Sequence, residues 1–333
     1  MGQSRIPVID LGLWLSGDTA ARERTARRVD EALRTAGFLL ITGHGVDPAL
    51  RTRIREAARA FFRLPEAAKR PYAVRVGGRG WLGPGAEANA YADTSADTSG
   101  PDGSGDAPNP PDLKESLSFA AEEPTGDAAV DAEWFLPNTW PAEAPGLRPL
   151  VETYVARMRS LSDAVLELLA EALGVPLDFF TRHTRHPTWG FNINWYPGRD
   201  VVGEPEPGQF RIGPHTDFGT VTILDRQHGK GGLQVFTDEG GWEDAPYDPG
   251  AFTVNIGDLM ARWTGDRWRS GRHRVLPPPA DAPAEELMSL VYFYECDPRT
   301  RVESLPAPVG TVAYEPVDSH TYLRARLDAI SAD

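Results

Sequence analysis

The chain has 333 residues, of which 41% are hydrophobic and 25% are charged, and its formal net charge is −14. These values are ordinary for a globular protein, and the acidic balance argues against a protein that binds nucleic acid or anionic membranes, because both need a basic surface. Without a long apolar run, a signal-peptide core or a second cysteine beside Cys296, the sequence predicts a cytoplasmic protein with a small-molecule partner and indicates no oligomeric state.

Residues 1–120 are predicted to form an α/β region. The expected elements are a strand over residues 6–11, a helix over 19–36, a buried strand over 38–42 and a helix over 47–63. Gly37 is suited to end the first helix, and Asp47 is suited to cap the second. Residues 77–111 are rich in Gly, Pro, Ser and Asp, so we expect a mobile loop there, either a lid or an inert insertion.

Residues 121–185 are predicted to be a linker followed by a long helix that backs a sheet. Apolar residues recur at helical spacing between positions 147 and 173, among them Leu161 and Val165, and Gly174 is suited to end this helix.

Beyond residue 186 the pattern changes to short β-like runs bounded by Gly, Pro or Asp. These runs cover residues 189–195, 210–212, 221–224, 233–236, 252–256 and 287–294. Their spacing favours a jelly roll over residues 186–300, followed by a tail and helix over residues 301–333. The predicted fold class is therefore mostly β with flanking helices, in one compact unit.

His215 and Asp217 stand two residues apart, and His273 follows on a later strand. If residues 213–224 form one strand, its period of two places His215 and Asp217 on the same face. Two imidazoles and a carboxylate on one face of an octahedral ion leave the other face open, as a non-haem Fe(II) centre needs in order to hold a co-substrate and O2. A structural zinc site would instead prefer four closed ligands rich in cysteine. The triad therefore predicts an oxygenase.

Six further segments accompany the triad. They are residues Ile6–Leu11, Gly37–Val46, Phe61–Pro65, Asp112–Ser116, Asn194–Pro197 and Asn255–Met260. With these motifs the chain resembles, nearly from end to end, the isopenicillin N synthase-like family of Fe(II)/2-oxoglutarate-dependent oxygenases.

The resemblance implies a distorted double-stranded β-helix with iron inside. It implies that His215, Asp217 and His273 bind Fe(II), and that Asn194 and Tyr196 face the co-substrate pocket. The enzyme would use Fe(II), 2-oxoglutarate and O2 to hydroxylate, desaturate or cyclise a small molecule, such as a secondary metabolite in antibiotic biosynthesis.

The sequence departs from the family at one position. The family has an Arg-x-Ser motif on the strand after the distal histidine, whose arginine binds the far carboxylate of 2-oxoglutarate. This chain keeps Ser289 but has Leu287 in place of the arginine. Because a buried carboxylate needs a cationic partner, either another basic residue serves or the co-substrate differs, and Arg262 is our first candidate for a substitute. A shifted strand register with an unusual pocket is an equal alternative. The other arginines considered are Arg267, Arg272 and Arg274.

Phe218, Phe236 and Gln227 are candidates for the substrate pocket, although aromatic residues on barrel strands are more often core. The missing arginine keeps open a second activity, a 2-oxo-acid-independent Fe(II) oxidase of the isopenicillin N synthase type. A third possibility is a non-catalytic jelly-roll module that binds a small molecule.

Overall fold

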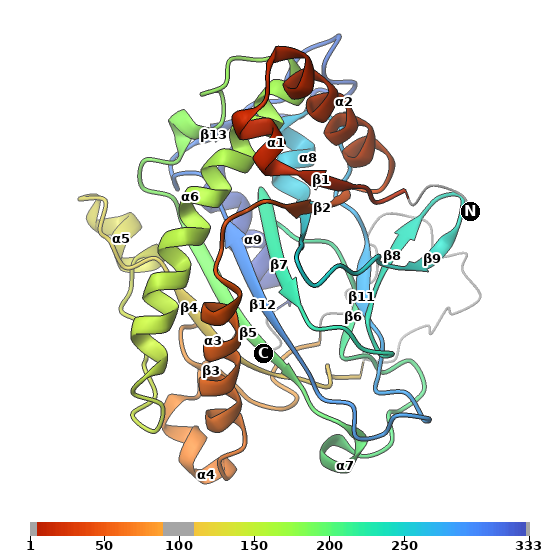
Figure 1. Ribbon diagram of the computed structural model, residues 1–333. Helices are drawn as coiled ribbons and strands as arrows, with labels where there is room; N and C mark the ends of the chain where they lie inside the picture. Colours follow the sequence, from red (N-terminus) through yellow and green to blue (C-terminus); the bar gives the residue numbers. More distant parts are fainter. Residues whose placement is uncertain (1–4, 89–109, 331–333) are drawn as a thin grey trace.

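The computed structural model describes residues 5–88 and 110–330, and two facing sheets form its centre (Figure 1). The larger sheet has the strand order β1-β2-β10-β7-β12-β5-β4-β3, and the smaller one has the order β6-β11-β8-β9. β13 and β14 form a separate two-stranded ladder. Apart from the β1-β2 pair, which is parallel, the neighbouring strands in these sheets are antiparallel.

The strands of the larger sheet are β1 (Val8–Asp10), β2 (Phe38–Thr42), β3 (Trp81–Leu82), β4 (Glu115–Ala120), β5 (Trp189–Tyr196), β7 (Val221–Arg226), β10 (Phe252–Ile256) and β12 (Leu287–Tyr294). The remaining strands are β6 (Ile212–His215), β8 (Leu233–Thr237), β9 (Gly241–Asp244), β11 (His273–Val275), β13 (Arg301–Val302) and β14 (Val317–Asp318). The α-helices are α1 (Leu11–Ser16), α2 (Thr19–Thr35), α3 (Pro48–Phe62), α4 (Glu66–Lys69), α5 (Ala128–Trp134), α6 (Leu147–Leu173), α7 (Arg199–Val202), α8 (Asp258–Trp263) and α9 (Ser319–Ile330).

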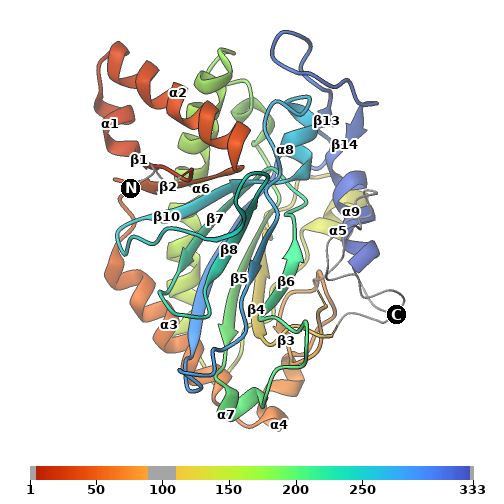
Figure 2. The ribbon, with the colours of Figure 1, turned by 90° about the vertical axis from the view of Figure 1, so that its right-hand side faces the viewer.

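Helices α3 and α6 cover the outer face of the larger sheet, and the smaller sheet lies across its inner face (Figures 1 and 2). Helix α6 buries one face because its apolar side chains recur at helical spacing; Leu161, Val165 and Leu169 are among the buried ones. It ends at Gly174, whose φ of 71° is the left-handed conformation of a helix C-cap. The predicted backing helix is thus confirmed, with the bounds expected.

Two local expectations need correction. The strand expected over residues 6–11 covers only Val8–Asp10, because Asp10 caps α1 and Leu11 starts that helix. The loop expected over residues 77–111 contains β3, whose buried Trp81 and Leu82 pair with β4. Residues 89–109 of that predicted loop lie outside the described residues.

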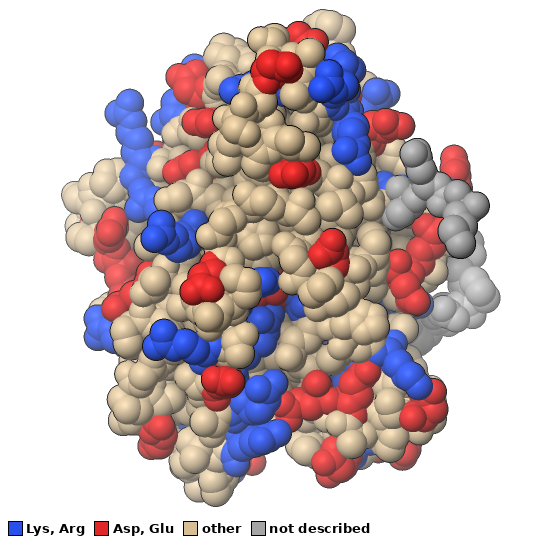
Figure 3. Space-filling model, in the orientation of Figure 1, with Lys and Arg blue, Asp and Glu red and all other residues tan. Residues whose placement is uncertain are grey.

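No helix in the described part of the chain is long and apolar enough to cross a membrane. On the face that α3 and α6 cover, basic and acidic side chains are interspersed (Figure 3).

Candidate metal and co-substrate site

His215, Asp217 and His273 meet between the two sheets. His215 ends β6 and His273 begins β11, and these two residues are direct partners across the ladder. Oδ1 of Asp217 lies 3.9 Å from Nε2 of His215 and 3.8 Å from Nε2 of His273. The three potential ligand atoms all lie within 4.8 Å of one another. Because metal–imidazole bonds are about 2.0–2.1 Å long, one ion can reach all three atoms.

The backbone between His215 and Asp217 is not the strand that the spacing suggested. β6 ends at His215, residues 216–220 form a turn, and β7 starts at Val221. The first N–H groups of helix α8 hold this turn: Asp258 N donates to Asp217 O at 2.8 Å. Leu259 N donates to Phe218 O at 3.0 Å. The unpaired donors at a helix start therefore fix the position of Asp217.

Both imidazoles are oriented by backbone carbonyl groups. Nδ1 of His215 lies 2.8 Å from Gly213 O, and Nδ1 of His273 lies 3.1 Å from Gly271 O. A carbonyl only accepts hydrogen bonds, so each Nδ1 carries the proton and each Nε2 offers its lone pair. Burial lowers the pKa of His215, an effect reinforced by His273, so that its imidazole stays neutral and available as a ligand.

The carboxylate of Asp217 is held on its other side. Its Oδ2 accepts hydrogen bonds from Thr222 Oγ1 and from Asn255 Nδ2, both at 2.6 Å. Burial alone would raise the pKa of Asp217, but the two neighbouring histidines and these hydrogen bonds outweigh it and lower that pKa. An ionised carboxylate with one free oxygen and two neutral imidazoles fit a divalent cation with open coordination positions.

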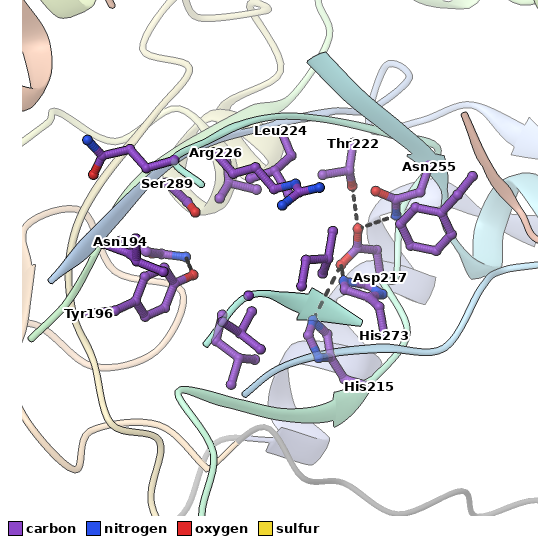
Figure 4. Close-up of a pocket in the computed structure, with 18 of the residues that line it drawn as sticks. Asn194, Tyr196, His215, Asp217, Thr222, Leu224, Arg226, Asn255, His273 and Ser289 are labelled. Carbon is purple, nitrogen blue, oxygen red and sulfur yellow. Dashed lines mark hydrogen bonds and ion pairs between the residues drawn. The ribbon is translucent and has the colours of Figure 1, made fainter. Parts of the chain in front are cut away.

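A cavity adjoins the triad (Figure 4). Its described lining residues are Phe38, Asn194, Tyr196, Ile212, His215, Asp217, Thr222, Leu224, Arg226, Gln227, Gly232, Leu233, Asn255, His273, Val275, Leu287, Ser289, Val291 and Phe293. The triad lies at one end of this cavity, and Asn194, Tyr196 and Ser289 lie at the other (Figure 4).

The predicted co-substrate residues Asn194, Tyr196 and Ser289 all reach this cavity, because β5 and β12 pair so that Asn194 is opposite Ser289. Nδ2 of Asn194 lies 3.4 Å from the hydroxyl of Tyr196, and its Oδ1 accepts a 2.8 Å hydrogen bond from Ser116. Burial raises the pKa of Tyr196, although the nearby Lys114 opposes this effect. The phenol therefore stays neutral and can donate a hydrogen bond to a ligand.

Gln227 borders the cavity as expected, but the other predicted pocket residues do not. Phe218 packs beneath the guanidinium of Arg326, and Phe236 packs on Trp242. Arg262 is also outside the cavity: it lies on α8, donates to the Glu315 carbonyl and stacks on Tyr314. The three other arginines considered lie elsewhere too: Arg267 pairs with Asp30, Arg272 covers Phe236, and Arg274 lies between Phe210 and Trp242.

The sequence reasoning missed three residues of the site. Thr222 and Arg226 are on β7 and Asn255 is on β10. Alternation along β7 places positions 222, 224 and 226 on the same face, and the expected strand over residues 221–224 already predicts this for positions 222 and 224. Arg226 was not predicted as a site residue, because the expected strand ended at Leu224, two residues before the observed end of β7.

The chain matches known family models and known proteins over most of its length. A model described as the non-haem dioxygenase in morphine synthesis N-terminal region matches residues 6–143, and the 2OG-Fe(II) oxygenase superfamily model matches residues 190–295. Validamycin A dioxygenase from Streptomyces hygroscopicus subsp. limoneus is 46% identical over 306 residues, which cover 92% of this chain and 80% of that protein. The chain belongs to the 2OG-Fe(II) oxygenase superfamily.

This oxygenase is also 33% identical to gibberellin 20 oxidase 2 of Oryza sativa subsp. japonica, across 93% of this chain and 72% of that protein. The crystal structure of a full-length Neurospora crassa protein in complex with alpha-KG and thymine superimposes with a TM-score of 0.80 at 26% identity. The match covers 99% of this chain and 98% of the Neurospora chain.

Several sequence predictions are thereby confirmed. The protein has the jelly-roll core of its family and is a dioxygenase that uses Fe(II), 2-oxoglutarate and O2 on small molecules. These relatives favour the 2-oxoglutarate-dependent enzyme over the oxidase and over the non-catalytic module.

Proposed function

We propose that His215, Asp217 and His273 are the Fe(II) ligands of this dioxygenase. The observation that carries the proposal is the convergence of two imidazole lone pairs and one carboxylate oxygen at the end of a cavity. Bound iron would supply oxidising power by coupling the decarboxylation of 2-oxoglutarate to succinate and CO2 with oxidation of the substrate by O2.

The residues around the triad have separate tasks in this proposal. Thr222 and Asn255 hold Asp217 so that only Oδ1 faces the ion. Leu224, Val291 and Phe293 give the cavity an apolar wall, which limits the access of water to the reaction. Tyr196 and Asn194 present polar atoms at the opposite end of the cavity, where a polar co-substrate would need them.

We propose that the substrate is a secondary metabolite, namely validamycin A or a compound closely related to it. The 46% identity to validamycin A dioxygenase over 92% of this chain supports this choice, since the other relatives compared are more distant. The reaction would be hydroxylation, desaturation or ring closure of that compound.

The test is aerobic incubation of the protein with Fe(II), 2-oxoglutarate and validamycin A, with succinate and the products followed by mass spectrometry. Succinate formation that rises with validamycin A, together with a product that has gained oxygen or lost hydrogen, would support the proposal. The His273→Ala variant should be inactive and should bind Fe(II) weakly. Succinate formation that validamycin A does not change would reject this substrate, and full activity of His273→Ala would reject the assigned ligands.

A further inference from the structure

The cavity wall has an apolar residue where the family has its arginine. Leu287 lies in β12 opposite Tyr196 and is buried in this wall. The far carboxylate of 2-oxoglutarate would therefore have no cationic partner at position 287. Burying a carboxylate without a cation or several hydrogen bonds is strongly unfavourable.

Arg226 is the one Lys or Arg among the described residues that line the cavity. It ends β7, and in the pairing of β7 with β12 it is directly opposite Ser289. Ser289 is in turn opposite Asn194 on β5. Three neighbouring strands thus place Arg226, Ser289 and Asn194 in one row on the cavity wall (Figure 4).

The guanidinium of Arg226 forms no ion pair with a carboxylate of the described chain. Its Nη2 donates to the carbonyl groups of Ala245 and Pro246, at 2.9 and 2.6 Å, and its buried Nε has no hydrogen-bond partner. Burial lowers the pKa of Arg226, and the charges of Tyr247 and Asp244 oppose this effect only in part.

Two other buried basic residues near the cavity differ from Arg226 in this respect. Lys114 pairs with Glu87 at 2.5 Å, and Arg211 pairs with Glu285 at 2.9 Å. Their charges are neutralised within the protein, so neither is available to a ligand in the way that Arg226 is.

We propose that Arg226, together with Ser289, binds the far carboxylate of 2-oxoglutarate and so replaces the arginine that the family has at position 287. Residues two apart on one strand are about 6.7 Å apart, and directly opposed residues on paired strands are about 5 Å apart. Arg226 can therefore reach the Ser289 hydroxyl from β7 as an arginine at position 287 would from β12.

Arg226 and the residue that holds Asp217 lie on the same face of β7, one toward each end of the cavity. Thr222, which contacts Asp217, is four residues before Arg226 on the same face of β7, about 13 Å along the strand. Between them Leu224 and Val291 form an apolar stretch of the wall. A molecule with one carboxylate at the metal and another at Arg226 would place its methylene groups against these two side chains.

This inference rests on the proposed Fe(II) site, and its test measures binding rather than turnover. The Fe(II)-loaded protein is titrated with 2-oxoglutarate without oxygen, and the visible charge-transfer band of the chelate gives the Kd. Arg226→Leu should raise the Kd for 2-oxoglutarate about 10- to 100-fold, because charge-assisted hydrogen bonds are lost. Its Kd for 2-oxovalerate, which lacks the far carboxylate, should stay the same.

Two variants serve as matched controls. Arg262→Gln removes an arginine that lies outside the cavity, so its Kd for 2-oxoglutarate should equal that of the parent. Adding Leu287→Arg to Arg226→Leu returns a cation to the family position and should recover most of the lost affinity. The Fe(II) affinity of each variant, measured in parallel, shows whether the metal site has remained intact.

The outcomes separate the two proposals. If the parent gives no chelate band, the Fe(II) function proposed above fails and the assignment of Arg226 fails with it. If the parent titrates normally and Arg226→Leu keeps the same Kd for 2-oxoglutarate, only the assignment is overturned. A rise in the substrate KM with an unchanged Kd for 2-oxoglutarate would also overturn it, because Arg226 would then bind the substrate.

Discussion

The side-chain amide of Asn255 donates a 2.6 Å hydrogen bond to Oδ2 of Asp217, while Oδ1 of the same carboxylate faces His215 and His273. The two oxygens therefore have different tasks: one anchors the side chain to the larger sheet, and the other remains for a metal ion. Thr222, the neighbour of Asn255 across the β10-β7 ladder, donates to the same Oδ2. The larger sheet thus sets the direction of a residue that the turn after β6 supplies.

We expect Asn255→Ala to weaken Fe(II) binding about 10- to 100-fold, which is the usual effect of losing a hydrogen bond to a metal ligand. Thr222→Val should have a similar effect, since each removes one donor to Oδ2 of Asp217. The measurement is an anaerobic titration with Fe(II). Asn138→Ala is the control, because the Asn138 side chain forms its hydrogen bonds with the backbone of Ala120 and not with Asp217. This variant should lower stability without changing the affinity for Fe(II). Parent-like affinity in both site variants would contradict this role.

Gly257 lies against the turn that carries Asp217. A Cβ at this position would lie 2.5 Å from Gly219 O and 2.9 Å from Asp217 O, and these backbone atoms cannot move independently. We expect Gly257→Ala to lower the free energy of unfolding by about 1–3 kcal/mol, as is typical of overpacking, and to weaken Fe(II) binding because Asp217 is displaced. Urea unfolding and metal titration measure the two effects.

Gly146→Ala is the matched control for Gly257→Ala. No atom lies within 4 Å of the added Cβ, and Gly146 already has a right-handed helical backbone at the start of α6. This variant should be neutral or slightly stabilising, by up to about 1 kcal/mol. The packing explanation fails if the two alanine variants behave alike.

Most elements near the site could be predicted from local patterns, but the position of Asp217 could not. The period of two correctly brought His215 and Asp217 together, yet for the wrong reason, because the strand ends at His215. The turn is stabilised by N–H groups of α8, about 40 residues later in the chain, and such a contact leaves no local signal.

The end of β7 is a second feature that local sequence patterns do not predict. A strand stopping at Leu224 was reasonable, because Asp225 and Arg226 are charged. Pairing with β12 extends the strand to Arg226, and Asp225 is accommodated on the other face by ion pairs with Arg51 and Arg55. Both partners are on α3, far away in the sequence. The residue proposed to replace the family arginine was therefore hidden by a tertiary contact.

Glu295, just after β12, is a buried carboxyl group whose protonation should affect stability. Burial raises its pKa from 4.5 to about 8, although the backbone N–H of Thr220 donates to it at 2.7 Å. The native state therefore keeps a proton that the unfolded state has lost. The stabilisation is complete below pH 4.5 and is lost as the pH rises toward 8, with a slope of up to about 1.4 kcal/mol per pH unit.

We expect Glu295→Gln to flatten this dependence, because the amide is neutral at every pH and its oxygen can still accept from Thr220 N. Urea unfolding of parent and variant between the two pKa values measures the difference. The free energy of unfolding of the variant should increase relative to that of the parent as the pH rises. This difference should become constant above the pKa of the buried group. If the difference in free energy of unfolding between parent and variant is constant across that range, Glu295 is ionised in the folded protein. The hydrogen bond from Thr220 would then stabilise a buried carboxylate.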